Sequence, residues 1–305
     1  MKRLMIVSWL LVIASMAGAQ GQAGTDIAVL KAGVGARPLG MGGAFTAVAD
    51  NADAPYWNPA GLGMVKQNEI TTMQTKLSTD ADHYYVSYIR PAFGGTLGIS
   101  WIQVGLGSIT QTSSEVDINN EVQNLSIFSY FSNAYMLSYG KELNDRISIG
   151  LTTKYLTSDM FGISGGQAYG YSVTPGILLR LATGDQRQVT VGAKVDELFN
   201  QQSWGTGTVE QVPPKLRFGL ACKLPNPGLF ALDISQTIKS GYSPELSAGY
   251  EYNQAGLSLR LGYNDGGLSA GAGFQVDHTR VDYAYVTQRA LSKDNVHRIS
   301  LSGIW

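Results

Sequence analysis

Hydrophobic and polar residues alternate one by one along most of this chain. From about residue 68 onward the pattern has a period of two, which in a β-strand places successive side chains on opposite faces. Ile149, Leu151 and Tyr155, for example, alternate with Gly150 and Lys154. One face of each segment is apolar, and the other carries small residues with scattered charges. This sustained period predicts an all-β protein and excludes a helical one.

Fourteen segments follow the pattern, and turn-forming residues separate them. The expected strands are 68–77, 82–90, 95–104, 132–141, 146–157, 168–182, 187–196, 213–223, 228–236, 244–252, 256–263, 268–276, 279–287 and 296–304. The interval 105–131 is expected to be a long connection, although Ile127 to Phe131 has the composition of further strand.

The connections between these strands fall into two classes. Every second one is short and turn-like, such as Pro225–Gly228. The connections between them, at the opposite end of the strands, include every long one: 105–131, 158–167, 197–212, 237–243 and 288–295. A closed antiparallel barrel across an outer membrane has an even strand number, short periplasmic turns and longer outer loops. We therefore expect a transmembrane antiparallel β-barrel of about 14 strands. A soluble β-sandwich is the alternative, but it does not predict this sorting.

Composition and the N-terminus agree with an exported membrane protein. Charged residues make up 15% of the chain, whereas about 25% is usual in soluble domains. Lys2 and Arg3 precede an apolar stretch, and Ala17-Gly18-Ala19 fits a small-residue cleavage site. We expect a signal peptide over residues 1–19, cleaved after Ala19, and a mature protein in the bacterial outer membrane.

The last strand ends on an aromatic residue, as the strands that close outer-membrane barrels do. Ile299, Leu301 and Trp305 lie on one face of this strand, and Arg298 lies on the other. We expect Ile299, Leu301 and Trp305 to form the membrane-insertion signal that the barrel-assembly machinery recognises.

The sequence contains no catalytic constellation, no metal site and no cofactor motif. The three histidines have no metal-ligand spacing and are interpreted as surface or interface residues: His83, His278 and His297. Glu115, Asp117 and Glu121 could chelate calcium, but a solvated acidic loop is the favoured interpretation. A net charge of −1 gives no basis for a nucleic-acid partner. The chain is therefore expected not to be an enzyme.

Residues 20–66 do not alternate, and they carry two sequence elements. The first is Arg37-Pro38-Leu39-Gly40-Met41-Gly42-Gly43-Ala44-Phe45, and the second is Tyr56-Trp57-Asn58-Pro59-Ala60-Gly61. Both resemble the N-terminal region of FadL-like outer-membrane proteins and of the related PorV/PorQ group. The resemblance implies a 14-stranded barrel (67–305) with the segment 20–66 folded inside as a plug. A disordered periplasmic tail is the alternative.

The residues of the plug follow from these two elements. The resemblance places the following residues in the plug: Arg37, Gly40, Met41, Gly42, Gly43, Phe45, Tyr56, Trp57, Asn58, Pro59, Ala60 and Gly61. Glycines suit such a segment because they permit tight turns and close approach to a wall.

Basic residues outnumber acidic ones on the face expected to line the lumen. The basic set is Lys154, Arg180, Lys194, Arg217, Arg260 and Arg298. The acidic set is Asp233, Glu251 and Asp282. A mildly basic lumen favours a ligand with an anionic head. The same charges could instead tie the plug to the wall or bridge across the barrel, and the sequence leaves both interpretations open.

Two functions from different classes remain. The FadL-like resemblance implies passive uptake of small hydrophobic molecules, captured at the outer side, where the apolar residues are Ile127, Phe128, Tyr130 and Phe131. The PorV-like resemblance implies a non-enzymatic accessory that binds proteins of a secretion or surface-attachment system. The expected partners are thus outer-membrane lipid and either a hydrophobic small molecule or secretion-system proteins.

Overall fold

The structure is a computed structural model that describes residues 27–77, 80–182, 188–287 and 295–305. The expected signal peptide (1–19) and residues 20–26 of the expected plug lie outside this part of the chain.

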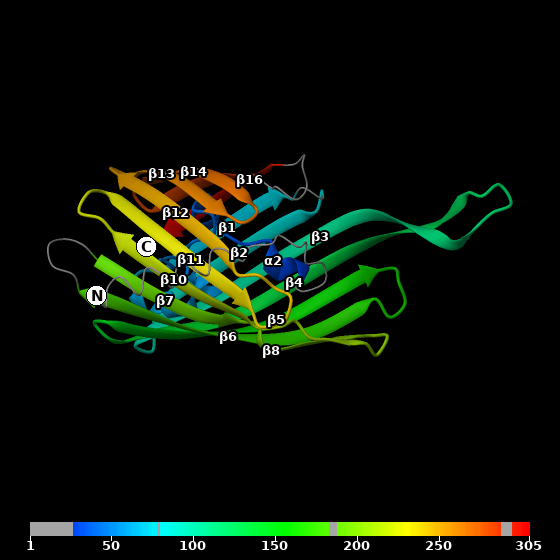
Figure 1. Cartoon of the computed structure of the whole chain (residues 1–305), viewed down its shortest axis with the longest axis horizontal. Helices are drawn as coiled ribbons and strands as arrows, with labels where there is room; N and C mark the ends of the chain where they lie inside the picture. The colour runs from blue at the N-terminus through cyan, green and yellow to red at the C-terminus, as the bar shows by residue number, and fades with distance from the viewer. Residues whose placement is uncertain (1–26, 78–79, 183–187, 288–294) are drawn as a thin grey trace.

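Fourteen strands form a closed antiparallel ring (Figure 1). They are β1 (Glu69–Lys76), β2 (Asp82–Ala92), β3 (Gly95–Val116), β4 (Val122–Asn144), β5 (Ile147–Phe161), β6 (Gln167–Ala182), β7 (Gln188–Asp196), β10 (Lys215–Lys223), β11 (Gly228–Thr237), β12 (Glu245–Gln254), β13 (Leu257–Asn264), β14 (Gly267–Val276), β15 (Thr279–Val286) and β16 (Val296–Ile304). β1 pairs with β16, and β5 pairs with β6, so the ring is complete. Each observed strand matches one of the fourteen predicted ranges, which confirms the predicted fold class.

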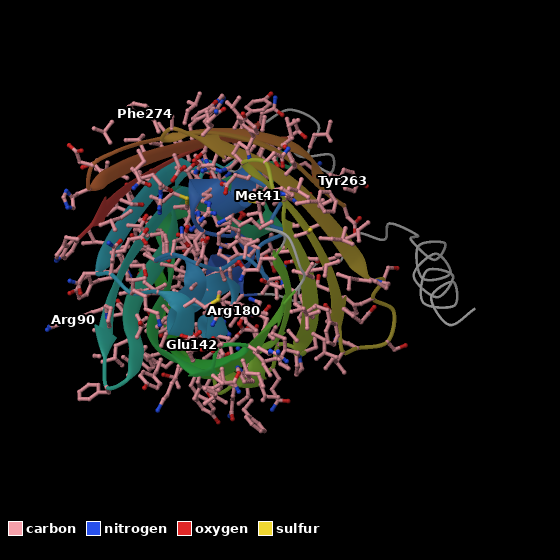
Figure 2. All side chains as sticks on the ribbon, turned by 90° about the vertical axis from the view of Figure 1, so that its left-hand side faces the viewer. Met41, Arg90, Glu142, Arg180, Tyr263 and Phe274 are labelled. Atoms are coloured by element: carbon pink, nitrogen blue, oxygen red, sulfur yellow. The ribbon has the colours of Figure 1, made fainter. Side chains whose placement is uncertain are left out.

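Burial follows the predicted alternation. Along β5, Ser148, Thr152 and Lys154 are buried, whereas Leu151 and Tyr155 on the opposite face are exposed. Figure 2 shows Phe274 and Arg90 pointing away from the ring, and Met41 lying within it. An exposed apolar band around the outside of a barrel suits contact with lipid acyl chains.

The interval 105–131 differs from the prediction, because most of it is strand. β3 and β4 run on as a two-stranded hairpin that ends in a short turn at 117–121 (Figure 1). We call residues 106–130 the arm. In the interval 197–212 the chain forms two short strands, β8 (Leu198–Trp204) and β9 (Val209–Glu210), and β8 pairs with the outer part of β6. Both intervals expected to be loops thus form additional β-sheet that extends beyond the fourteen-stranded ring.

The segment that precedes the barrel contains short helices: α2 (Ala28–Lys31), α3 (Ala36–Gly40), α4 (Ala54–Trp57) and η2 (Pro59–Met64). None of the helices in the described part of the chain is long and apolar enough to cross a bilayer. We call residues 27–66 the N-terminal segment. η2 contacts β3, β4, β5 and β6, whereas α3 contacts β13, β14, β15 and β16. The N-terminal segment therefore touches opposite parts of the ring.

Inward-facing glycines let the N-terminal segment lie directly against the main chain of the wall. Several of them are register partners on adjacent strands: Gly140 with Gly150, Gly150 with Gly176, Gly192 with Gly219, and Gly249 with Gly262. A methyl group at Gly150 would overlap Pro59 and Ala60, and one at Gly262 would overlap Met41 and Gly42. The small inward residues therefore provide clearance for packed protein, rather than space for water.

Adding a methyl group at Gly150 should destabilise the protein. We expect Gly150→Ala to lower the free energy of unfolding by about 1–3 kcal/mol, because the new group must displace main chain. Gly303→Ala is the matched control, since the nearest atom to its methyl group is Ile70 Cγ2 at 3.5 Å. Guanidinium unfolding in detergent micelles measures both variants. Equal stability of the two variants would show that the main chain at Pro59 can move away from the new methyl group without a measurable cost.

Candidate functional site

Hydrogen bonds from many strands hold the N-terminal segment. The Ala36 amide donates to Ser300 Oγ on β16 at 2.9 Å. The amides of Phe45 and Thr46 both donate to Asp233 Oδ2 on β11, at 3.1 and 2.9 Å. On the other side of the ring, Thr152 Oγ1 of β5 donates to the Pro55 carbonyl at 2.9 Å. Main-chain groups of the segment that would otherwise be buried without partners are thus satisfied by the wall.

The aromatic and amide residues of the expected plug form a compact centre. Trp57 is buried and makes edge contacts with Phe45 and Tyr56, at ring-centroid distances of 6.2 and 5.2 Å. Trp57 Nε1 donates to the Val34 carbonyl at 2.9 Å. Asn58 Nδ2 donates to the Thr46 carbonyl at 2.8 Å, and Asn58 Oδ1 accepts from the Ala60 amide at 3.1 Å. The two sequence elements of the N-terminal segment therefore pack on each other.

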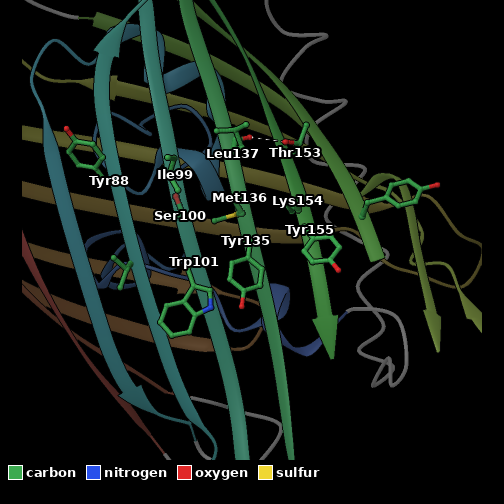
Figure 3. Close-up of a pocket in the computed structure, with 12 residues that line it drawn as sticks. Tyr88, Ile99, Ser100, Trp101, Tyr135, Met136, Leu137, Thr153, Lys154 and Tyr155 are labelled. Carbon is green, nitrogen blue, oxygen red and sulfur yellow. Dashed lines mark hydrogen bonds between the residues drawn. The ribbon is translucent and has the colours of Figure 1, made fainter. Parts of the chain in front are cut away.

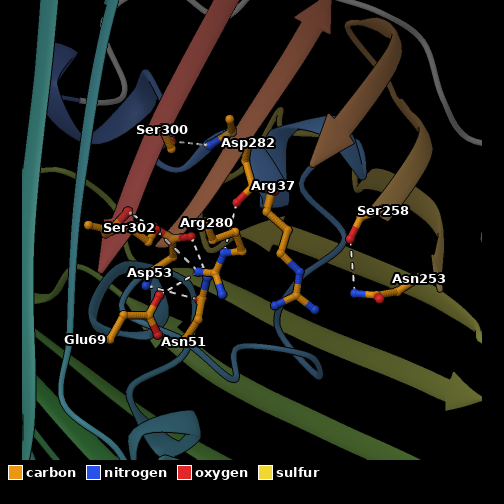
Figure 4. A network of polar contacts seen from close by, with 12 residues as sticks. Arg37, Asn51, Asp53, Glu69, Asn253, Ser258, Arg280, Asp282, Ser300 and Ser302 are labelled. Carbon is orange, nitrogen blue, oxygen red and sulfur yellow. Dashed lines mark hydrogen bonds and ion pairs between the residues drawn. The ribbon is translucent and has the colours of Figure 1, made fainter. Parts of the chain in front are cut away.

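A chain of alternating charges links the N-terminal segment to β12, β13 and β15. Figure 4 shows four of its members: Arg37, Asp282, Arg280 and Glu69. Arg37 contacts Asp50 at 2.5 Å and Glu251 at 2.8 Å. Arg260 contacts Glu251 at 2.6 Å and Asp282 at 2.7 Å. Arg280 continues the chain, with Asp282 at 3.0 Å and Glu69 at 2.5 Å. Because these groups are largely buried, each charge needs a neighbour of opposite sign.

Four other lumen cations are also neutralised. Lys154 Nζ lies 2.5 Å from Glu197. Asp196 forms ion pairs with Lys194 at 2.7 Å and with Arg217 at 3.5 Å. Arg180 forms an ion pair with Glu142, and both residues are labelled in Figure 2. Lys194 also donates to the Tyr56 carbonyl at 2.9 Å, and the Arg217 guanidinium lies over the Trp57 ring. Five of the six predicted basic residues thus have carboxylate partners, and these partners lie on or beside the strands of the wall.

Arg298 is the exception among the six. Among the described residues, no carboxylate lies within ion-pair distance of Arg298, which is buried. Its Nη1 faces the Gly33 carbonyl at 3.3 Å and His83 Nδ1 at 3.4 Å. Arg298 Nε and His83 Nε2 have no hydrogen-bond partner in the part of the chain that the structure describes. His83 is therefore not a surface residue, because it is fully buried and faces inward.

One carboxyl group of the N-terminal segment, that of Asp53, has a pKa well above its usual value. Burial raises the pKa of Asp53 to about 7, although a hydrogen bond from Asn51 Nδ2 at 2.9 Å opposes the shift. Its folded-state pKa lies above the value of an unfolded chain, so Asp53 favours the folded state less as pH rises from about 4 through 7. The contribution of Asp53 to the packing of the N-terminal segment is thus largest in acid and is lost by about pH 7.

A continuous apolar strip runs along the inner face of β3, β4 and β5. Its buried part comprises Ile102 and Val104 of β3, Ala134 and Met136 of β4, and Leu156 of β5. Ile27, Val29 and Leu30 of the N-terminal segment pack in the same cluster. Toward the outer side the strip continues through Leu106, which is half-buried and also packs against the cluster.

The four residues predicted to capture a ligand lie on two different faces of the arm and its base. Phe128 and Tyr130 are half-buried and continue the inward face, and their register partners are Ile109 and Leu106. Ile127 and Phe131 continue the outward face and are exposed. The structure therefore joins Phe128 and Tyr130 to the apolar strip and separates Ile127 and Phe131 from it.

A depression of about 720 Å³ lies on the outward face of β2 to β6 (Figure 3). Its aromatic side chains are register partners on adjacent strands: Trp101 with Tyr135, Tyr135 with Tyr155, and Tyr155 with Tyr171. Next to this row, Asn133 Oδ1 accepts from Trp101 Nε1 at 3.2 Å and from Gln103 Nε2 at 2.9 Å. Aromatic rings beside outward polar groups mark the edge of the bilayer. We therefore interpret this depression as a lipid contact.

Several residues that complete the site have no distinguishing signal in the sequence. Arg280 and Glu69 extend the charge chain, and Asp196 and Glu197 neutralise lumen lysines. Asp196 and Glu197 lie at the end of β7, where face assignment from alternation stops. Arg280 and Glu69 stand at strand ends, so their positions resembled turn residues. The predicted insertion residues Ile299, Leu301 and Trp305 are exposed, and Trp305 stacks on Tyr88 at 6.1 Å.

Neutralising Glu251 should loosen the N-terminal segment. We expect Glu251→Gln to lower the free energy of unfolding by about 3 kcal/mol, because Arg37 and Arg260 lose their shared carboxylate. Glu245→Gln on the same strand is the matched control, since Glu245 is half-exposed and binds Lys215. Guanidinium unfolding measures stability, and ion conductance in planar bilayers reports opening of the lumen. A Glu251→Gln protein as stable and as closed as the control would contradict this role.

The sequence has no match among family models and none among curated protein sequences. The structure, by contrast, resembles solved membrane channels. It is similar to the Pseudomonas putida toluene transporter TodX, with a TM-score of 0.62 at 13% identity, over 90% of this chain and 99% of that chain. It is similar to the Ralstonia pickettii toluene transporter TbuX, with a TM-score of 0.55 at 13% identity, over 89% and 97% of the two chains.

A Pseudomonas aeruginosa FadL homologue is also similar, with a TM-score of 0.54 at 11% identity, over 89% of this chain and 98% of that chain. At sequence identities this low, the similarity is evidence for the fold alone. None of the structures named here is described as a PorV or PorQ protein, so the secretion-accessory role stays a prediction. The chain has the fold of the FadL-like outer-membrane channels, as the two N-terminal elements predicted.

Proposed function

We propose that this chain is a passive channel that takes up small hydrophobic molecules across the outer membrane, and that residues 20–66 form its plug. The observation that carries the proposal is the continuous apolar strip on the inner face of β3, β4 and β5. An inward apolar surface has no role in a water-filled pore, but it favours an apolar cargo by removing its surface from water.

The route begins at the base of the arm. A molecule leaving water first meets Ile109, Phe128, Leu106 and Tyr130, which are half-buried and continuous with the lumen. It then follows Val104 and Ile102 inward, where Val29 and Leu30 of the N-terminal segment now pack. Because the strip and these residues share one apolar cluster, cargo competes with them for the same surface. Displacement of residues 27–34 therefore accompanies passage.

Arg298 and His83 favour cargo that also carries an anionic head. His83 is the register partner of Val104, so the unpaired cation adjoins the apolar strip. A buried cation without a carboxylate costs free energy that a bound anion recovers. The head group of an amphiphile would contact Arg298 while its tail lies along Val104 and Ile102.

Uptake by the purified chain in lipid vesicles tests this function against the secretion-accessory alternative. A channel conducts a fluorescent hydrophobic probe into vesicles without any other protein, whereas an accessory has no need to conduct. Vesicles with the chain that take up the probe no faster than empty vesicles would refute the proposed function.

Replacing Phe128 should slow uptake selectively. We expect Phe128→Asp to reduce the uptake rate about tenfold, since a carboxylate on the inward face removes an apolar contact and repels anionic heads. Ile127→Asp is the matched control, because Ile127 adjoins Phe128 but lies on the outward face. Equal losses in both variants would assign the effect to arm charge and not to the apolar strip.

Removing the Arg298 charge should abolish discrimination between head groups. We expect wild-type protein to bind decanoate about tenfold more tightly than decanol, and Arg298→Gln to bind the two alike, because a charge-assisted hydrogen bond is lost. Titration in detergent micelles, followed by tryptophan fluorescence, gives both affinities. A variant that keeps the preference for decanoate would place the head-group site elsewhere.

A further inference from the structure

Within the part of the chain that the structure describes, the arm has two unpaired strand edges. β3 pairs with β2 up to Gly105 opposite Asp82, and β4 pairs with β5 up to Ser129 opposite Phe161. Beyond these points, β3 and β4 pair with each other as far as Val116 opposite Val122. Figure 1 shows the arm projecting past the rest of the molecule. Main-chain donors and acceptors along both edges are therefore available to another chain.

The edge of β4 has few of the features that normally prevent edge pairing, although bulges interrupt its register with β3 between Gln111 and Thr112 and between Thr112 and Val116. Residues Val122 to Phe128 read Val-Gln-Asn-Leu-Ser-Ile-Phe, with no charge, proline or glycine. Leu125 is 61% exposed and Ile127 is 72% exposed. Native proteins usually guard such an edge with lysine, proline or a covering element. A free ribbon of two strands is also marginally stable in water, so this edge gains from a third strand.

The charge of the arm indicates which kind of partner it would bind. Glu115, Asp117 and Glu121 lie at its tip, and residues 105–131 contain no lysine or arginine. Asp117 stabilises the turn, because its carboxylate accepts from the amides of Asn119 and Glu121 at 2.8 and 2.9 Å and from Gln123 Nε2 at 3.0 Å. Glu115 and Glu121 are exposed, and their carboxylates are available to a cationic partner.

We propose that the arm docks a protein partner through an extended segment that adds a strand to the edge of β4 at 122–128. This segment carries lysine or arginine near Glu115 and Glu121, together with alternating apolar residues that cover Leu125 and Ile127. Main-chain hydrogen bonds supply affinity, and side chains on alternate positions supply specificity. A second copy of this chain fits poorly, because two arms side by side would bring like charges together.

The docking edge and the uptake route use different parts of the hairpin. The route uses the inward face at its base, from Leu106 to Phe128, whereas docking uses the main-chain edge and the outward residues Leu125 and Ile127. Changes at the tip should therefore leave uptake unchanged, and Phe128→Asp should leave uptake impaired whatever the arm binds. Failure of the channel proposal and failure of the docking proposal are thus distinguishable.

The test uses the full-length protein in detergent micelles and a synthetic peptide of alternating lysine and valine. Fluorescence anisotropy measures binding of this peptide, of a glutamate–valine counterpart, and of a lysine–valine peptide N-methylated at alternate residues. We expect the unmodified lysine–valine peptide to bind at least tenfold more tightly than either of the others. N-methylation removes edge hydrogen bonds without changing charge, so it separates strand addition from simple charge attraction.

Two variants complete the test. Glu115→Lys with Glu121→Lys should reverse the preference toward the glutamate–valine peptide, and it leaves the turn-forming Asp117 in place. Leu125→Lys with Ile127→Lys should weaken lysine–valine binding at least tenfold. Heat-modifiable migration on gels verifies that each barrel is folded. Equal binding of the N-methylated peptide, an unchanged preference in the reversed variant, absence of binding, or arm-dependent dimers in sedimentation would each overturn the proposal.

Discussion

The structure depends on how closely the N-terminal segment approaches the main chain of the barrel wall. Strands that carried ordinary side chains inward would hold this segment several ångströms further from their backbone. Glycines at matched positions on neighbouring strands, such as Gly140, Gly150 and Gly176, remove that spacing. Pro59 and Asn58 then lie directly on the sheet. Close packing of two backbones leaves little room for water, so most main-chain polar groups in the contact depend on protein partners.

The charge chain follows from this exclusion of water. The Arg37 side chain is largely removed from solvent, and the buried Glu251 and the half-exposed Asp50 neutralise it. Glu251 is shared with Arg260, which in turn requires Asp282. Each additional buried charge thus extends the chain by one partner of opposite sign. Breaking any link leaves an uncompensated charge, so each ion pair of the chain depends on its neighbours.

Alternation predicted the fourteen strands, because each strand is half lipid-facing and half inward-facing. Their even number and the sorting of short and long connections predicted the closure of the barrel. It did not show what fills the barrel. Small inward residues such as Gly150 and Thr152 fit a water-filled lumen and a packed interior equally well. Similarly, the period of two assigned Lys154 and Arg260 to the inward face, but not their partners. Glu197 follows the end of β7, and its position depends on tertiary structure.

The arm shows why the capture residues could not be sorted by sequence. Leu106 pairs with Tyr130 and Ile109 pairs with Phe128, so β3 advances three residues while β4 advances two. This bulge, at which Ser108 has a φ of 58°, moves Ile109 to the same face as Leu106. Strict alternation would have put Ile109 on the outward face. A single extra residue therefore extends the apolar strip from the lumen to the base of the arm and leaves the outward side of the arm free for a different contact.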